Sequence, residues 1–133
     1  MARSRMYNES AKILVIDDEP EITEIVDAFL TTAGYEVAVE NSSHGGIQRA
    51  IEFKPDLILL DIMLPVMDGY DVCNVLKKDA TTASVPIVFL TGKDVRDDQG
   101  RSFTSGCDLF VKKPFSCERL LDIVKIVLLS VNK

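Results

Sequence analysis

The sequence predicts an α/β fold in which five parallel strands form one doubly wound sheet with helices on both faces. Five short apolar segments alternate with longer segments that show helical periodicity. Nearly continuous apolar runs, such as the one at 57–60, are typical of strands covered on both faces, as in parallel sheets. Alternation of strand and helix then gives right-handed crossovers, which place helices on the two faces.

Length and composition indicate one globular domain with its own core. The chain has 133 residues, of which 47% are hydrophobic and 27% are charged. Residues 1–10 are polar and are interpreted as an N-terminal extension, so the domain is expected over 11–133. No internal repeat or linker interrupts this second range.

Charge and cysteine usage exclude several function classes. The formal net charge of -6 argues against direct nucleic-acid binding, which needs a basic surface. No apolar run approaches the roughly 18 residues that span a bilayer, so we expect no membrane insertion. Cys73, Cys107 and Cys117 show no CxxC spacing, which favours free thiols in a reducing cytoplasm.

The first half of the chain contains three expected strands and two expected helices. The strands are placed at 12–16, 35–39 and 57–60. Pro20 begins the first helix, and Gly34 ends it. Its apolar stripe is expected to comprise Ile22, Ile25, Val26, Phe29, Leu30 and Ala33. The second helix begins after a cap within 41–43 and ends before 54–56.

The second half completes the alternation. A loop rich in proline and glycine at 62–69 precedes the third helix, and strands are expected at 85–90 and 108–111. The fourth helix, at about 94–105, has a thin apolar stripe and Gly100 in its interior, so we expect it to be the least stable element. Ser116 caps the last helix, and Ile126 and Leu129 fall off its apolar stripe.

The polar residues that could bind a ligand or take part in a reaction all lie just after strands. Asp17 and Asp18 follow the first strand, Asp61 the third, Thr91 the fourth and Lys113 the fifth. In a parallel sheet these ends share one edge, where ligands bind. Three converging carboxylates repel one another and suit Mg²⁺, which prefers carboxylate and phosphate oxygens. A lysine and a hydroxyl nearby complete a site for a phosphoryl group.

The ordered set of motifs resembles the receiver domain of two-component response regulators over about 12–131. It comprises the acidic turn at 17–19, Asp61 followed by Pro65 and then Asp68 and Gly69, Thr91, and the segment 113–115. The resemblance implies a flavodoxin-like (βα)5 fold with strand order 2-1-3-4-5.

The resemblance also implies the chemistry of the acidic residues. Asp61 is expected to accept a phosphoryl group from a phosphohistidine of a sensor histidine kinase or a histidine phosphotransfer protein. Mg²⁺, with Mn²⁺ as a substitute, is expected on Asp17, Asp18, Asp61 and the backbone carbonyl of Met63.

The remaining roles follow from the same resemblance. Lys113 is expected to pair with a phosphate oxygen, and a cis peptide bond before Pro114 to aim it. Thr91 and Phe110 are expected to act as switch residues that reposition after phosphorylation. Lys112 is interpreted as a surface charge, and His44 as a surface histidine unrelated to the site.

The expected output is a change in the surface formed by the last two helices and the strand between them. That surface would support a homodimer or bind a downstream effector, and Ile126 and Leu129 would contribute to it. Both a stand-alone regulator and a receiver within a longer protein agree with the sequence.

Met63 and Lys93, two residues beyond Asp61 and Thr91, occupy positions where the family tunes phosphoryl lifetime. Met63 cannot hydrogen-bond a hydrolytic water strongly, which favours slow self-dephosphorylation. Gly92 leaves access to the phosphorylation site open.

Three rival functions fit the sequence less well than the phosphoacceptor role. An aspartyl-nucleophile phosphohydrolase usually needs a second carboxylate two residues after the nucleophile, where Met63 stands. An FMN-binding protein needs a hydroxyl- and glycine-rich phosphate loop, whereas the turn at 17–19 is acidic and would repel phosphate. A receiver-like scaffold that works without phosphorylation is disfavoured by the intact set of motifs.

Overall fold

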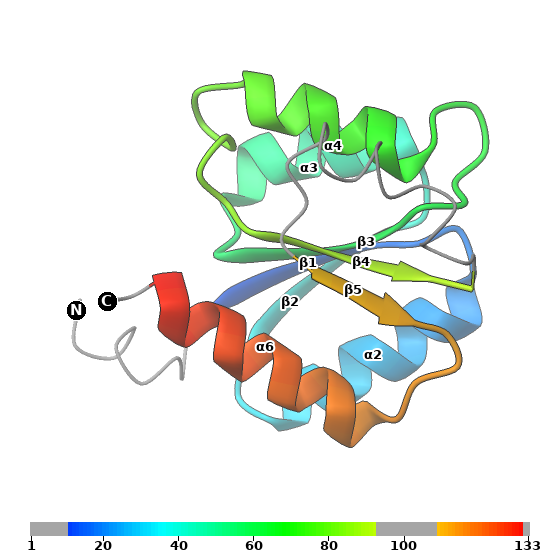
Figure 1. Ribbon diagram of the computed structural model, residues 1–133, viewed down its shortest axis with the longest axis vertical. Coiled ribbons are helices and arrows are strands. Elements are labelled where there is room, and N and C mark those ends of the chain that lie inside the picture. Colours follow the sequence, from blue (N-terminus) through cyan, green and yellow to red (C-terminus); the bar gives the residue numbers. More distant parts are fainter. Residues whose placement is uncertain (1–10, 93–108, 132–133) are drawn as a thin grey trace.

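The computed structural model describes residues 11–92 and 109–131. The expected polar extension, the expected helix at 94–105, Lys93 and Cys107 lie outside these ranges. From β1 to β4 and from β5 to α6, the described strands and helices alternate as the sequence predicts, and they carry the labels of Figure 1. They are β1 (Lys12–Ile16), α2 (Pro20–Thr32), β2 (Glu36–Glu40), α3 (Ser43–Phe53), β3 (Leu57–Asp61), α4 (Gly69–Lys78), β4 (Ile87–Thr91), β5 (Leu109–Lys112) and α6 (Cys117–Val131).

The five strands form one sheet in the order β2-β1-β3-β4-β5, and every neighbouring pair is parallel. This confirms the α/β class and the strand order 2-1-3-4-5. Since all strands run the same way, the residues after β1, β3, β4 and β5 meet at one edge of the sheet. Figure 1 shows α3 and α4 on one face and α2 and α6 on the other.

Residues of the three central strands alternate between two apolar cores. In β1, for example, Ile13 and Val15 face the core beneath α2 and α6, whereas Leu14 and Ile16 face the core beneath α3 and α4. The same alternation holds in β3 and β4. All four residues of β1 named here are fully buried. Full burial of both strand faces explains why these segments are continuously apolar rather than alternating with polar residues.

Most predicted helix ends are confirmed by the backbone. Pro20 is the first residue of α2, and Gly34 follows its C-terminus with a φ of 105°, a conformation that glycine adopts without a steric penalty. The Ser42 side chain accepts a hydrogen bond from the Gly45 N–H and so caps α3. Ser116 accepts one from the Arg119 N–H at the start of α6.

The predicted apolar stripe of α2 is wrong at two positions, Ile25 and Ala33. Ala33 is exposed and lies just beyond the helix, as its C-cap. Val26 and Leu30 are buried against the sheet, but Ile25 is 57% exposed. Thr23, which was not part of the predicted stripe, is buried instead, and its hydroxyl donates a hydrogen bond to the Pro20 carbonyl. The helix is therefore rotated so that Ile25 lies at the edge of the buried face rather than in its centre.

Strand ends differ from the prediction by one or two residues. Asp61 and Thr91 are the last residues of β3 and β4 rather than the first residues beyond them. β4 begins at Ile87, after Pro86, because proline lacks the N–H that a ladder position would use. In the part of the chain that the structure describes, none of the helices has the length and apolar character needed to cross a membrane.

Candidate functional site

Asp61 is a buried carboxylate at the carboxyl end of the central strand β3. Asp61 is only 2% exposed, and its Oδ1 accepts a hydrogen bond of 3.1 Å from the Met63 N–H. Burial and the charge of Asp17 raise the pKa of Asp61 to about 6, although the Met63 N–H and the Lys113 charge act in the opposite direction. The surroundings of Asp61 therefore disfavour its ionised form, and a positive partner stabilises that form.

Asp17 supplies a second buried carboxylate from the end of β1. It is fully buried, and its Oδ1 accepts a hydrogen bond of 3.0 Å from the Glu19 N–H. The Asn41 side-chain amide donates a 2.8 Å hydrogen bond to the Asp17 carbonyl oxygen, which ties this turn to the end of β2. These bonds fix the direction in which the Asp17 side chain leaves the sheet.

Lys113 brings a positive charge into this acidic group from just beyond β5. Its Nζ lies 2.7 Å from Asp17 Oδ2, 2.9 Å from Glu19 Oε1 and 3.6 Å from Asp61 Oδ2. Burial alone lowers the pKa of Lys113, but the hydrogen bonds to Asp17 and Glu19 outweigh it and raise that pKa. Lys113 thus remains charged across the physiological pH range.

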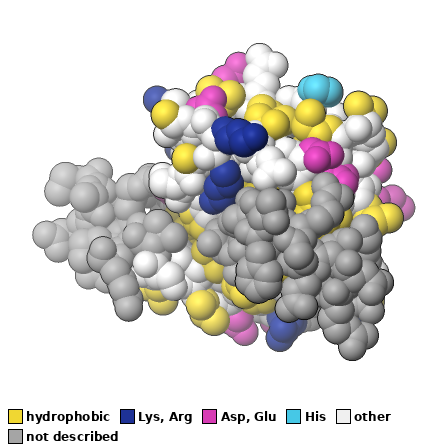
Figure 2. All heavy atoms as spheres, turned by 45° about the horizontal axis from the view of Figure 1, so that its top comes forward, with side chains coloured by type: hydrophobic (Ala, Val, Ile, Leu, Met, Phe, Trp, Pro, Cys, Tyr) yellow, Lys and Arg dark blue, Asp and Glu magenta, His cyan; other side chains and the backbone are white. Residues whose placement is uncertain are grey.

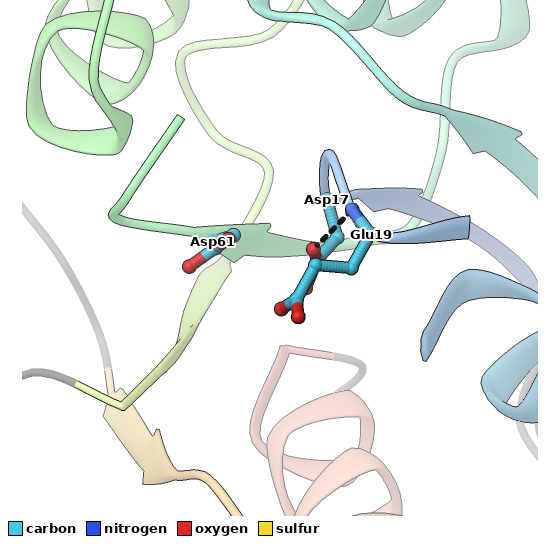
Figure 3. A group of neighbouring side chains, drawn as sticks. All are labelled: Asp17, Glu19 and Asp61. Atoms are coloured by element: carbon cyan, nitrogen blue, oxygen red, sulfur yellow. Dashed lines mark hydrogen bonds between the residues drawn. The ribbon is translucent and has the colours of Figure 1, made fainter. Parts of the chain in front are cut away.

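Figure 3 shows Asp17, Glu19 and Asp61 at the ends of β1 and β3, with the Glu19 backbone joined to Asp17 by a hydrogen bond. One carboxylate oxygen from each lies within 4.8 Å of the others. Glu19 is the member of this group to which the sequence analysis assigned no role. Its place in the acidic turn at 17–19 was a signal that it could join the site. The sequence of a turn does not show, however, which of its side chains point toward the site.

Asp18 lies beside this group rather than within it. Asp18 is exposed, and it lines a cavity of about 680 Å³ together with Glu19, Asp61, Met63, Gly92 and Lys113. Met63 is 58% exposed and Gly92 has open space where a side chain would begin. The cavity therefore opens the buried carboxylate of Asp61 to solvent and to an approaching molecule.

The two expected switch residues lie on neighbouring strands, Thr91 at the end of β4 and Phe110 within β5, where it is paired with Phe89. Thr91 is fully buried at the end of β4, and its carbonyl accepts a 2.8 Å hydrogen bond from the Lys113 N–H. Phe110 is half-buried, and its ring centroid lies 5.4 Å from that of Phe89. The Lys113–Pro114 peptide bond is cis, as the resemblance implied.

The residues that were expected to be unrelated to the site are at the surface. His44 is exposed at the start of α3, and Figure 2 shows the histidine as cyan spheres on the outside of the molecule. Lys112 is exposed, whereas the neighbouring Lys113 turns into the site. Because successive strand residues point to opposite sides, only one of the two lysines can serve the site.

The sheet order and the acidic edge with one lysine define a class of phosphoryl-binding signalling domain. The family described as "Response regulator receiver domain" matches residues 13–125. The chain belongs to this family, whose members are receiver domains of two-component systems.

Curated relatives match one part of longer proteins. The DNA-binding dual master transcriptional regulator RpaA of Synechocystis sp. is 40% identical over 88% of this chain and 48% of its own length. The phosphate regulon transcriptional regulatory protein PhoB of Pseudomonas aeruginosa is 38% identical over 87% of this chain and 51% of its own length. The chain thus spans about half the length of these relatives.

Solved structures of similar proteins share the whole fold. The chemotaxis protein CheY4 of Vibrio cholerae superposes with a TM-score of 0.85 at 28% identity, covering 89% of this chain and 98% of that one. The receiver domain of sensor histidine kinase PA1611 from Pseudomonas aeruginosa gives 0.82 at 27% identity, covering 90% and 98%. That structure holds a magnesium ion coordinated in its active site cleft.

The donor set of this chain fits a magnesium ion by its chemistry. Receiver domains bind Mg²⁺ at an acidic pocket. Here Asp17, Glu19 and Asp61 offer carboxylate oxygens within 4.8 Å of one another, and Glu19 and Asp61 line the cavity. Mg²⁺ prefers one or two carboxylates and keeps several waters, which an open cavity accommodates. Burial and the charge of Asp17 raise the pKa of Asp61, and a bound cation would lower that pKa by neutralising negative charge.

Proposed function

We propose that Asp61 is the phosphoacceptor of this receiver domain and takes its phosphoryl group from a phosphohistidine on a histidine kinase or phosphotransfer protein. The observation that carries the proposal is the buried Asp61 carboxylate, 3.6 Å from the Lys113 ammonium and open to a cavity. In the transfer, an Asp61 oxygen attacks phosphorus in line, the P–N bond breaks, and the histidine nitrogen keeps the electron pair.

The surrounding residues have distinct parts in this transfer. Lys113 neutralises charge on the phosphoryl oxygens, and the buried Thr91 hydroxyl supplies a hydrogen bond after phosphorylation. Asp17, Asp18, Asp61 and the Met63 carbonyl would hold Mg²⁺, with Mn²⁺ as a substitute. The bound cation would neutralise charge that develops between donor and acceptor. The domain thereby assists its own phosphorylation and dephosphorylation without turning over an external substrate.

A second cavity beside the site supports the approach of a protein phosphodonor. It has a volume of about 360 Å³ and shares Glu19 and Lys113 with the first cavity. Its walls are otherwise mainly apolar, including Ile22, Ile25, Val26, Pro114 and Phe115. Since Ile25 is 57% exposed at this place, we propose that a helix of the phosphodonor packs here and brings its histidine to Asp61.

We further propose that phosphorylation changes a surface that includes β5 and α6. Ile126 is 60% exposed and Leu129 is 56% exposed on α6, and Leu109 is 40% exposed at the start of β5. A second copy or an effector would bury these side chains. A solution mass that stays monomeric with and without a phosphoryl analogue would contradict the homodimer.

The domain is proposed to occupy residues 11–133, with 1–10 as an extension, and to work in the cytoplasm. Of the described cysteines, Cys73 is buried and Cys117 is half-buried, and neither takes part in a disulfide.

The test of the phosphoacceptor is labelling by a small phosphodonor in the presence of Mg²⁺. The unaltered protein is expected to gain one acid-labile phosphoryl group, and Asp61→Asn is expected to gain none because an amide is a poor nucleophile. Asp122→Asn, which changes an exposed carboxylate on α6, is the matched control and should label like the unaltered protein. Unchanged labelling of Asp61→Asn would refute the assignment.

A further inference from the structure

The Lys113 ammonium is shared between two carboxylates in unlike surroundings. Asp17 is buried, whereas the Glu19 side chain is 54% exposed and reaches Lys113 from the solvent side. The Glu19 contact is nevertheless short, with Oε1 2.9 Å from Nζ. Lys113 lies farther from Asp61, at 3.6 Å, than from either of these partners.

This arrangement bears on phosphoryl binding because an ammonium has only three N–H donors. Two of them are directed at Asp17 and Glu19. A phosphoryl group on Asp61 presents several strong acceptor oxygens, and Lys113 must turn toward them to neutralise their charge. The Glu19 hydrogen bond opposes that movement, and the Glu19 charge also repels the phosphoryl oxygens.

The same Glu19 charge has the opposite effect on a cation. One of its oxygens lies within 4.8 Å of oxygens of Asp17 and Asp61. A divalent cation held by those carboxylates would gain from the third negative charge whether or not Glu19 coordinates it. A cation would also repel the Lys113 ammonium, and the hydrogen bond from Lys113 to Glu19 would offset part of that repulsion.

We propose that Glu19 is a positioning residue that keeps the Lys113 ammonium just beyond hydrogen-bond distance of Asp61 in the resting protein, which favours the cation and opposes the phosphoryl group. The inference rests on the proposed phosphoacceptor function, and it assigns to Glu19 the balance between the two ligands of the site. If Glu19 has this role, removing its charge should weaken the binding of the cation and strengthen the binding of the phosphoryl group.

The experiment compares the unaltered protein, Glu19→Gln and Glu24→Gln. Glu24 is an exposed glutamate on α2, so its substitution makes the same change in net charge. Affinity for Mg²⁺ alone is measured by calorimetry, and affinity for beryllofluoride, a phosphoryl analogue, by ¹⁹F NMR at saturating Mg²⁺. Circular dichroism verifies that each variant is folded.

Glu19→Gln is expected to bind Mg²⁺ about threefold to tenfold more weakly, since a charge next to a divalent ion is removed at a partly screened site. It is expected to bind beryllofluoride at least about threefold more tightly, because Lys113 is released and a repelling charge is lost. Glu24→Gln should change both affinities by less than about twofold, since Glu24 is exposed and water and salt screen its charge.

The outcomes separate this inference from the function on which it rests. Suppose that Glu19→Gln weakens the binding of both ligands, or changes neither affinity by more than the Glu24→Gln control does. Glu19 then does not restrain Lys113, and the inference is wrong. In that case, an unaltered protein that binds both ligands still supports the proposed function. An unaltered protein that binds neither ligand would overturn the proposed function and the inference together.

Discussion

Gly69 packs directly on the backbone of Asp61, at the first turn of α4. A Cβ placed on Gly69 would overlap the carbonyl oxygen of Asp61, and the Gly69 N–H donates a 2.8 Å hydrogen bond to the Ile62 carbonyl. Asp68 caps the same helix by accepting a hydrogen bond from the Asp71 N–H. The start of α4 is thereby held against the residue that carries the chemistry.

Gly69→Ala is therefore expected to lower the free energy of unfolding by about 2–3 kcal/mol, because the backbone of β3 cannot move aside cheaply. Urea unfolding followed by circular dichroism measures the change. Gly92→Ala is the control, since nothing lies within 4 Å of the position of its Cβ. Equal effects of the two substitutions would show that the packing on Asp61 is not the cause.

Asp61→Asn is expected to stabilise the protein at neutral pH and not at acidic pH. The pKa of Asp61 is raised to about 6 by burial and by Asp17, above the ordinary value of 3.8. The folded protein therefore binds this proton more tightly than the unfolded chain does. Protonated Asp61 therefore stabilises the folded, unaltered protein. This contribution is fully present below about pH 4 and is lost as the pH rises through about 6.

At pH 8 the amide should increase the free energy of unfolding by about 1–3 kcal/mol, the upper limit following from about 1.4 kcal/mol per pKa unit. Urea titrations at pH 4.5 and pH 8 measure the difference, with Asp122→Asn as the control on an exposed carboxylate. Added Mg²⁺ should narrow the gap, because the ionised carboxylate then has a positive partner. A gain in stability that is the same at both pH values would rule out this origin.

Met63 is expected to make the phosphorylated state long-lived. Its side chain is 58% exposed and lines the cavity at Asp61, but it offers no strong hydrogen bond to a water attacking the phosphoryl group. Met63→Asn supplies an amide there and should shorten the phosphoryl half-life about tenfold by orienting that water. The loss of acid-labile label over time measures the rate.

Val66→Asn is the control for Met63→Asn, because Val66 is 95% exposed in the same loop. It should leave the half-life unchanged. A half-life of seconds in the unaltered protein would contradict slow self-dephosphorylation from the outset.

Ile25→Ser is expected to slow transfer from a protein phosphodonor without affecting a small one. Truncating an exposed apolar side chain at the centre of a binding surface typically costs more than about 1 kcal/mol, which corresponds to a decrease of about fivefold or more in kcat/KM. Ile51→Ser, on α3 and the opposite face of the sheet, changes a side chain that is 37% exposed and serves as the control. If Ile25→Ser slows both kinds of donor equally, it acts on the site rather than on docking.

The sequence by itself determined the sheet and the edge at which the chemistry lies. Continuous apolar runs marked β1, β3 and β4 as strands buried on both faces, and the alternation with helices required a parallel sheet. Parallel strands place their carboxyl ends together, so Asp17, Asp61 and Lys113 were expected to converge. That Lys113 and Asp17 meet across 96 positions of sequence agrees with this expectation.

Only the tertiary structure decided which side chains of each segment face the site. Helical periodicity placed Ile25 in the apolar stripe of α2, but the rotation of that helix against the sheet leaves it exposed and buries Thr23. The acidic turn likewise offered three carboxylates, of which Asp17 and Glu19 reach Lys113 while Asp18 lies at the rim. Local sequence sets the period of a segment, whereas its rotation and the direction of its turns are set by packing against residues distant along the chain.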